Sequence, residues 1–236
     1  MAELIDVDLD GKKVPALLGL PSGQGPHPGI LVMHHQEGLS PFTRDLVDKL
    51  AKLGCVALSV SNYHACPPDA DMQTKRESVR DGQLTRDAGA GIAFLESHPL
   101  VLKGNLAVIG HCMGGRTAFL AASVFPVFAA AIAYYGGGVY RKTIGGMPVG
   151  DRLKNIQCPV IGFWGGRDPI IPNADVDRIE AELKRAGVPC EFHRYPEAGH
   201  AFCNFTVPAD FRADADADSW RKTVAFLRRE LKLPRD

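Results

Sequence analysis

Runs of apolar residues alternate with amphipathic stretches along most of the chain. Residues 29–33 (Gly-Ile-Leu-Val-Met) form a continuous apolar run of the kind that is buried on both faces of a parallel sheet. The segment 42–53 has apolar residues at helical spacing and ends at Gly54. The next apolar run, 55–60, again predicts a strand. A strand, a helix and a second strand in this order are typical of a parallel sheet.

The same alternation continues to the end of the chain. Two N-terminal strands are expected at 3–9 and 13–20, joined by a turn at Asp10-Gly11. Further strands are predicted at 105–111, 128–135, 159–164 and 190–195, and further helices at about 77–97, 113–124, 173–186 and 216–232. Residues 63–74 and the Gly-rich segment 136–155 are predicted to be loops. We therefore expect one α/β domain over residues 1–236, with a mostly parallel central sheet flanked by helices on both faces.

Composition and charge narrow the possible partners. Lys and Arg together number 27, as do Asp and Glu, and no long basic run is present, so we expect neither nucleic acid nor a membrane as partner. The N-terminal residues lack the order of a signal peptide, and no apolar stretch approaches the roughly 20 residues that span a bilayer. The six cysteines lack C-x-x-C spacing, which favours reduced thiols in a cytoplasmic protein.

A cysteine lies where a predicted strand turns into a predicted helix. The run Gly-His-Cys-Met-Gly-Gly at 110–115 has the form of a nucleophile elbow, G-x-S-x-G, with Cys112 in place of serine. Gly110 and Gly114 remove side chains that would collide in so tight a turn. The helix N-terminus favours a thiolate or an oxyanion. The alternative interpretation is a small buried cysteine in a Gly-rich loop.

Two further residues complete a possible catalytic set. Asp168 follows the predicted strand 159–164 and His200 follows the strand 190–195, in the chain order nucleophile, acid, histidine. A thiol needs a base at neutral pH, and the imidazole of His200 can supply one while Asp168 orients it. One oxyanion donor is expected at the N–H of Met113, and the other in the loop after residues 29–33.

Five segments together resemble the dienelactone hydrolase family, over about residues 12–232. They are His35-Gln36-Glu37-Gly38, Gly110-His111-Cys112-Met113-Gly114-Gly115, Tyr134-Tyr135-Gly136, Gly166-Arg167-Asp168 and Gly199-His200-Ala201-Phe202. The resemblance implies an α/β-hydrolase fold and hydrolysis of small esters or lactones through a thioacyl-enzyme, with no metal or organic cofactor. It also implies that Glu37 contacts the resting thiol until substrate redirects it, and that the N–H groups of Gly38 and Met113 bind the oxyanion.

The substrate-binding residues depart from the family pattern. The family places an arginine four residues after the histidine to hold the carboxylate of dienelactone, and here that residue is Asn204. A second arginine is expected before the helix at about 77, where Arg76 and Arg80 are both candidates. An amide does not replace a bidentate guanidinium, so a neutral ester, a lactone or another activated acyl compound is also consistent. Tyr135 and Phe202 are expected to line the pocket.

Two other functions stay open at this point. A promiscuous esterase of this type could also attack phosphotriesters. A non-hydrolytic protein could use Cys112 to sense oxidants or electrophiles, although such a sensor has less need of Asp168 and His200. Histidines at 34, 35, 64 and 111 lack the spacing of a zinc site, so no metal is expected. The expected partner is a small-molecule ester or lactone, with the chain as a monomer or homodimer.

Overall fold

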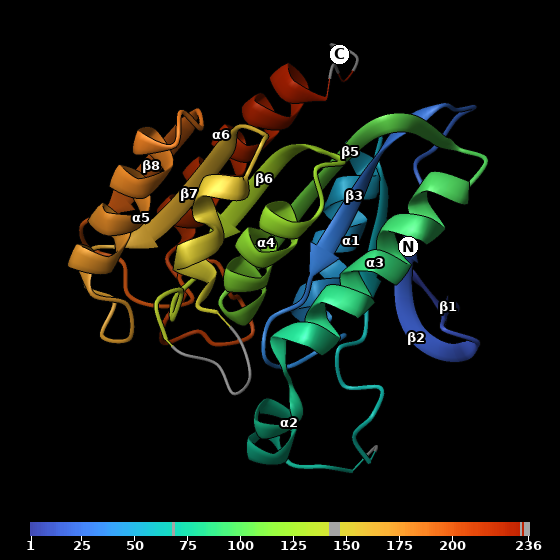
Figure 1. The fold of residues 1–236 in the computed structure, drawn as a ribbon, viewed down its shortest axis with the longest axis horizontal. Helices are drawn as coiled ribbons and strands as arrows, with labels where there is room; N and C mark the ends of the chain where they lie inside the picture. Colours follow the sequence, from blue (N-terminus) through green and yellow to red (C-terminus); the bar gives the residue numbers. More distant parts are fainter. Residues whose placement is uncertain (68, 142–146, 232, 234–236) are drawn as a thin grey trace.

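A central sheet organises the computed structural model, which describes residues 1–67, 69–141, 147–231 and 233. Within these residues the sheet has eight strands in the order β1-β2-β4-β3-β5-β6-β7-β8 (Figure 1). The strands are β1 (Glu3–Leu9), β2 (Lys12–Gly19), β3 (His27–Met33), β4 (Val56–Val60), β5 (Val101–His111), β6 (Phe128–Tyr134), β7 (Val160–Gly165) and β8 (Cys190–Tyr195). Strands β3 to β8 are parallel, whereas β1 and β2 are antiparallel to their neighbours.

Helices cover both faces of this sheet. They are α1 (Pro41–Lys52), α2 (Met72–Ser78), α3 (Asp81–Ser97), α4 (Met113–Val124), α5 (Asn173–Arg185), α6 (Ala213–Glu230) and the 3₁₀ helix η1 (Val149–Asn155). In the view of Figure 1, α3, α4 and α5 lie in front of the sheet, and α1 and α6 lie behind it. The α/β fold with a mostly parallel sheet is therefore confirmed.

Helix α1 shows how local sequence produces these elements. Ser40 is its N-cap, and the side chain of Ser40 accepts a hydrogen bond from the N–H of Thr43. Pro41 occupies the first turn, where a missing N–H costs nothing. Val47 and Leu50 are fully buried, because the apolar positions recur at helical spacing and face the sheet.

The region after β4 differs from the sequence prediction. A single helix over about 77–97 was expected, but the chain forms α2 and α3, with extended backbone at Val79 and Arg80 between them. Part of the predicted loop 63–74 is helical, because Asp71 caps α2 by accepting a hydrogen bond of 2.7 Å from the N–H of Thr74. Of the predicted loop 136–155, residues 142–146 lie outside the described residues.

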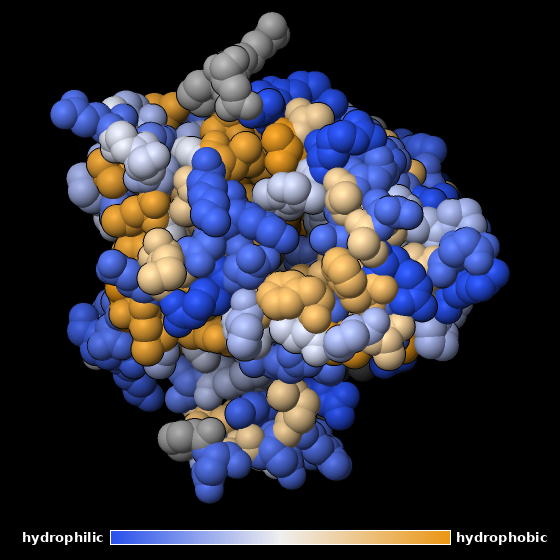
Figure 2. Space-filling view, turned by 180° about the vertical axis from the view of Figure 1, so that it is seen from behind, coloured by the Kyte–Doolittle hydropathy of each residue, from blue (hydrophilic) through white to orange (hydrophobic). Residues whose placement is uncertain are grey.

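The core lies between the sheet and its helices. Ile30, Leu58, Ile109 and Ile132, from four adjacent parallel strands, are all fully buried. The face turned away from Figure 1 is mostly hydrophilic, with hydrophobic side chains in groups between the polar ones (Figure 2). No helix in the described residues is long and apolar enough to cross a membrane. The parallel strands thus form a rigid base, and their carboxyl ends carry the candidate site.

Candidate active site

Cys112 occupies a strained turn between β5 and α4. Its backbone has φ 56° and ψ −119°, a conformation that non-glycine residues rarely adopt. The N–H of Cys112 donates a hydrogen bond of 3.0 Å to the carbonyl of Tyr134, and the Cys112 carbonyl accepts one of 3.2 Å from the N–H of Arg116. The turn therefore holds the thiol at the carboxyl end of β5, where α4 begins.

Glycines around this turn are required by close backbone contacts. A Cβ atom on Gly110 would lie 2.1 Å from the carbonyl oxygen of Gly114. A Cβ atom on Gly114 would lie 1.9 Å from the carbonyl oxygen of Met33. Both neighbours are backbone atoms, which cannot move without shifting a strand or the helix. The elbow can therefore pack this tightly against β3 only because these positions lack side chains.

We expect Gly114→Ala to destabilise the protein by about 3 kcal/mol or more, because the added methyl group overlaps backbone that cannot relax. Gly82→Ala in α3 is the matched control, since its Cβ would have no heavy atom within 4 Å. The free energy of unfolding of that variant should exceed the wild-type value by no more than about 1 kcal/mol. Urea unfolding followed by circular dichroism measures the stability of both variants. A Gly114→Ala variant as stable as wild type would contradict the packing described here.

Cys112, His200 and Asp168 form one hydrogen-bonded chain. The Nε2 atom of His200 lies 3.2 Å from the Sγ atom of Cys112, and its Nδ1 atom lies 2.7 Å from Oδ2 of Asp168. The other carboxylate oxygen of Asp168 accepts hydrogen bonds from the N–H groups of Ile170 (2.8 Å) and Ile171 (3.1 Å). The Asp168 side chain is only 1% exposed. The buried carboxylate thus fixes the imidazole with Nδ1 toward Asp168 and Nε2 toward the thiol.

The charge state of His200 follows from these contacts. Burial favours the neutral imidazole, but hydrogen bonds and negative charge from Asp168 and Cys112 outweigh it and raise the pKa of His200 to about 9, from 6.5. Protonation of His200 therefore stabilises the folded protein. This contribution is complete below about pH 6.5 and is lost as the pH rises through about 9.

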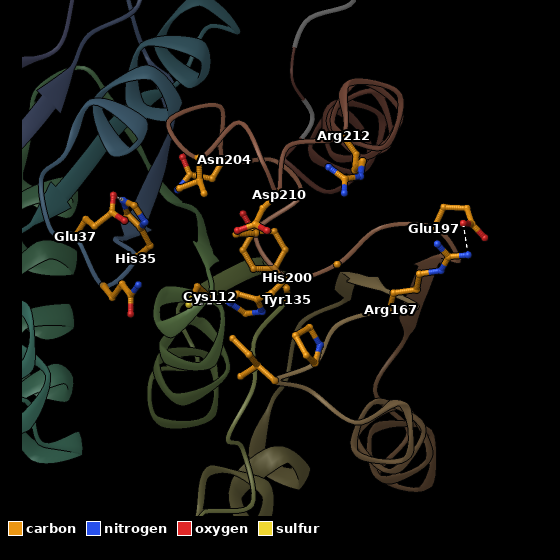
Figure 3. Close-up of a pocket in the computed structure, with 16 residues that line it drawn as sticks. His35, Glu37, Cys112, Tyr135, Arg167, Glu197, His200, Asn204, Asp210 and Arg212 are labelled. Atoms are coloured by element: carbon orange, nitrogen blue, oxygen red, sulfur yellow. Dashed lines mark hydrogen bonds and ion pairs between the residues drawn. The ribbon is translucent and has the colours of Figure 1, made fainter.

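A cavity of about 550 Å³ opens onto the thiol (Figure 3). We call it the loop compartment, because most of its wall comes from loops after β3, β7 and β8. Its lining residues are His35, Gln36, Glu37, Cys112, Tyr135, Arg167, Pro169, Ile170, Glu197, Gly199, His200, Ala201, Asn204, Val207, Asp210 and Arg212. Cys112 and His200 thus meet at a cavity that admits a small molecule, whereas the buried Asp168 is not among its lining residues.

Tyr135 and Phe202 are placed differently from each other. Tyr135 lines the cavity, and its ring packs edge-on against the imidazole of His200 at a centroid distance of 5.2 Å. Phe202 is fully buried and does not line the cavity within the described residues. Its ring packs behind Tyr135 at 5.3 Å. The prediction that Phe202 lines the pocket was therefore wrong: its side chain faces the core and supports Tyr135.

The loop after β3 also differs in detail from the expectation. The N–H of Gly38 donates a hydrogen bond of 3.0 Å to the carbonyl of His35, which leaves it unavailable for an oxyanion. The expectation for Gly38 is therefore not met in this structure. The N–H groups of Gln36 and Met113 make no hydrogen bond among the described residues, and both residues line a cavity at Cys112. Gln36 thus replaces Gly38 as the candidate second donor.

Glu37 lies in the cavity wall without contacting the thiol. Its side chain is 36% exposed, and Oε2 lies 3.8 Å from Nε2 of His35. Burial, together with the nearby His34, lowers the pKa of His35 to about 4, so this pair is not an ion pair at neutral pH. Among the described residues no hydrogen bond joins Glu37 to Cys112; the thiol contacts His200 instead.

The two candidate arginines are separated by the structure. Arg76 lines a second cavity that also contains Cys112 and His200. Arg80 lies between α2 and α3, and its guanidinium donates to the backbone carbonyls of Glu77 and Val79, away from both cavities. The prediction of Arg80 as a pocket residue was therefore wrong. Asn204 does line the loop compartment, where its Oδ1 accepts hydrogen bonds from the N–H and hydroxyl of Thr206.

Several pocket residues were not predicted from the sequence, among them Asp210, Ile170 and, in the second cavity, Arg141. All three lie in irregular loops, where no periodic pattern indicates the direction of a side chain. No group of three or more His, Cys, Asp or Glu side chains in the described part of the chain is arranged to hold a metal ion. All six cysteines are unpaired.

A nucleophile elbow at the end of a central parallel strand, followed along the chain by an acid and a histidine, defines an α/β-hydrolase fold. The model of the dienelactone hydrolase family matches residues 14–231, so the chain belongs to this family. A Methylorubrum extorquens protein named "Putative carboxymethylenebutenolidase" is 32% identical, over 95% of this chain and 79% of the relative.

Solved structures agree with this assignment. The crystal structure named "Putative Dienelactone Hydrolase" from Klebsiella pneumoniae has a TM-score of 0.89 and 27% identity, covering 96% of this chain and 98% of that one. A dienelactone hydrolase-like promiscuous phosphotriesterase from metagenomic libraries has a TM-score of 0.85 and 21% identity, with 98% of each chain covered. The second similarity shows the fold alone.

Proposed function

We infer that this protein hydrolyses esters or lactones of small molecules, with Cys112 as nucleophile, His200 as general acid and base, and Asp168 as the residue that orients it. The observation that carries this inference is the continuous chain of contacts from the thiol to the buried carboxylate, 3.2 Å and 2.7 Å long. Membership of the dienelactone hydrolase family supports the same chemistry.

In the first half of the proposed cycle, the thiol proton has passed to Nε2 of His200, forming the imidazolium–thiolate pair that the raised pKa of His200 favours. The thiolate sulfur of Cys112 then attacks the carbonyl carbon. A C–S bond forms and the carbonyl oxygen becomes an oxyanion, which the N–H groups of Met113 and Gln36 would bind. The tetrahedral adduct then collapses. The C–O bond to the leaving oxygen breaks, and that oxygen takes the proton from His200, which leaves a thioacyl-enzyme.

In the second half, His200 removes a proton from water, and the resulting hydroxide attacks the thioacyl carbonyl. The C–S bond breaks, and the proton held by His200 returns to the sulfur of Cys112. A carboxylic acid leaves and the resting enzyme is restored. For a lactone, the alcohol formed in the first half stays attached to the acyl group, so one product leaves at the end.

Glu37 is proposed to control ionisation of the thiol. Its carboxylate lies in the wall of the cavity that contains Cys112, and it would need to rotate to reach the sulfur. A carboxylate near the thiol disfavours the thiolate, whereas its withdrawal on substrate binding leaves the thiolate to pair with the imidazolium of His200.

Steady-state hydrolysis of dienelactone, p-nitrophenyl butyrate and paraoxon by wild type and Cys112→Ala tests this function. Turnover of either carboxylic substrate that is lost in the variant supports the proposed mechanism. Turnover of paraoxon alone would assign the site to phosphotriesters. Stoichiometric modification of Cys112 without turnover of any substrate would overturn the hydrolase proposal and favour a thiol sensor.

A further inference from the structure

The loop after β3 begins with a buried histidine that the proposed cycle does not use. His34 is only 1% exposed, and it is not among the described residues that line the two cavities at Cys112. Burial lowers the pKa of His34 to about 4, so its imidazole is neutral at neutral pH. A buried neutral imidazole has one donor and one acceptor nitrogen, and each of them needs a hydrogen-bond partner.

The two partners of His34 fix the position of the proton on its ring. The N–H of Asn62 donates a hydrogen bond of 2.9 Å to Nε2 of His34, so this nitrogen carries no proton. In the neutral ring the proton is then on Nδ1. This Nδ1 lies 2.7 Å from the carbonyl oxygen of His35, which can only accept. His34 is therefore held in the tautomer that donates to the main chain of the next residue.

The carbonyl of His35 shares a peptide group with the N–H of Gln36, the candidate second donor to the oxyanion. In this trans peptide group the two bonds point in opposite directions. The same carbonyl accepts a further hydrogen bond, of 3.0 Å, from the N–H of Gly38. Two donors thus hold the carbonyl on one side of the loop, and they thereby set the direction of the Gln36 N–H on the other side.

The peptide group that follows Gln36 is also held. Its carbonyl accepts a hydrogen bond of 2.7 Å from the hydroxyl of Tyr63, whose ring packs against the imidazole of His34 at a centroid distance of 5.2 Å. The carbonyl oxygen of His34 lies against the elbow, because a Cβ atom on Gly114 would be 2.8 Å from it. The backbone of Gln36 is therefore fixed relative to the elbow, where Met113 is the other candidate donor.

A buried polar network connects His34 to α3. The side-chain amide of Asn62 donates a hydrogen bond of 3.0 Å to one carboxylate oxygen of Asp87, and Nε2 of His64 lies 3.0 Å from the other. The carbonyl of Asn62 accepts a hydrogen bond of 2.8 Å from Nε2 of Gln83, which is also in α3. Asn62 and Asp87 are both buried. The N–H that Asn62 donates to His34 is therefore anchored on a helix outside the loop that it supports.

We propose that His34 is a positioning residue for the oxyanion site, because its hold on the carbonyl of His35 directs the N–H of Gln36 toward the cavity at Cys112. This role rests on the hydrolase function and on the oxyanion donors proposed above. In both halves of the cycle the oxyanion exists only when a tetrahedral adduct forms. Loss of the contact should therefore lower kcat and kcat/KM together and leave KM nearly unchanged.

Two substitutions of His34 separate its donor from its acceptor. In His34→Asn the amide nitrogen takes the place of Nδ1 and can keep the hydrogen bond to the carbonyl of His35. In His34→Gln the amide oxygen takes the place of Nε2, so the contact with the N–H of Asn62 can be kept while the donor to His35 is lost. With p-nitrophenyl butyrate we expect His34→Gln to lower kcat about tenfold, because a misdirected N–H stabilises the oxyanion less. His34→Asn should recover most of this loss.

Two controls isolate the effect on the oxyanion. Alkylation of Cys112 by iodoacetamide forms no oxyanion, so its rate, followed by mass spectrometry, should be the same in wild type and in both variants. His27→Gln is the matched control variant, because Nδ1 of His27 contacts the carbonyl of Gly54 at 3.1 Å and lies at the opposite end of β3. Its kcat should equal that of wild type. All rates are compared at a temperature at which circular dichroism shows every variant folded.

Three results would overturn the positioning role while the hydrolase function stands. They are a wild-type kcat in His34→Gln, equal losses in His34→Gln and His34→Asn, and a slower alkylation of Cys112 that matches the loss in kcat. The last result would place the defect in the thiol rather than at the oxyanion. Absence of ester hydrolysis in wild type would instead overturn the proposed function, and the role of His34 with it.

Discussion

Replacing Cys112 with alanine is expected to lower kcat for p-nitrophenyl butyrate by about four to six orders of magnitude, because no covalent intermediate can form. The folded structure should persist, since among the described residues the thiol has a single side-chain hydrogen-bond partner, His200. Residual hydrolysis above the rate in water would come from the oxyanion donors and from substrate binding alone. Steady-state kinetics together with mass spectrometry of the acylated protein measures both the rate and the intermediate.

Cys66→Ala provides the matched control. Cys66 is also a partly buried thiol, but it contacts Ser78 at 2.9 Å rather than His200. That variant should retain wild-type turnover and show the same thioacyl adduct as wild type. An active Cys112→Ala variant, or an adduct found on Cys66, would show that the nucleophile lies elsewhere. Loss of activity in both variants would point to a folding defect instead, and circular dichroism distinguishes this outcome.

The residues whose proximity sequence analysis predicted lie at or shortly after the carboxyl ends of strands. Cys112 is in a glycine-flanked run between an apolar strand and a helix, and Asp168 and His200 each follow a strand of the same sheet. Carboxyl ends of parallel strands meet at one edge, so chain order and strand position together predict their proximity. The hydrogen bonds from His200 to both partners agree with that prediction.

The residues that could not be predicted depend on loop conformation. The N–H of Gly38 is used by the carbonyl of His35 because the loop after β3 closes a turn there, and no sequence pattern specified that turn. Phe202 and Tyr135 are both aromatic residues that follow strands. Phe202 faces the core and Tyr135 lines the cavity, and this difference depends on the backbone conformation of each loop. Arg141 lies in a Gly-rich segment whose position is fixed by Arg116.

Backbone strain at Cys112 is linked to the close packing around it. The positive φ of Cys112 has a conformational cost that persists only where the neighbouring structure fixes the turn. Here that structure is the close contact of glycine backbone with β3 and the hydrogen bond from Cys112 to Tyr134. Asp168 is buried and accepts hydrogen bonds from two backbone N–H groups. Its carboxylate is therefore fixed, and so is the imidazole of His200 bonded to it. In the proposed mechanism both side chains would therefore be oriented before substrate arrives.

Asp168→Asn is expected to lower kcat for an alkyl ester such as ethyl butyrate by about three to four orders of magnitude. The Asn oxygen can keep the hydrogen bonds from Ile170 and Ile171, so the fold should be retained. Its amide nitrogen would then face Nδ1 of His200 as a donor, which favours the tautomer with the proton on Nε2. That tautomer cannot accept the thiol proton.

The pH dependence separates this electrostatic role of Asp168 from a purely structural one. In wild type, the imidazolium that protonates the leaving alkoxide is lost as the pH rises through about 9, so kcat/KM for ethyl butyrate should fall there. In Asp168→Asn the negative charge of the carboxylate is absent, and burial then dominates and lowers the pKa of His200. The alkaline fall in kcat/KM should therefore move to lower pH. For p-nitrophenyl butyrate the fall should be weaker, because nitrophenolate leaves without a proton. An unchanged alkaline midpoint in Asp168→Asn would show that the carboxylate does not set the charge of His200.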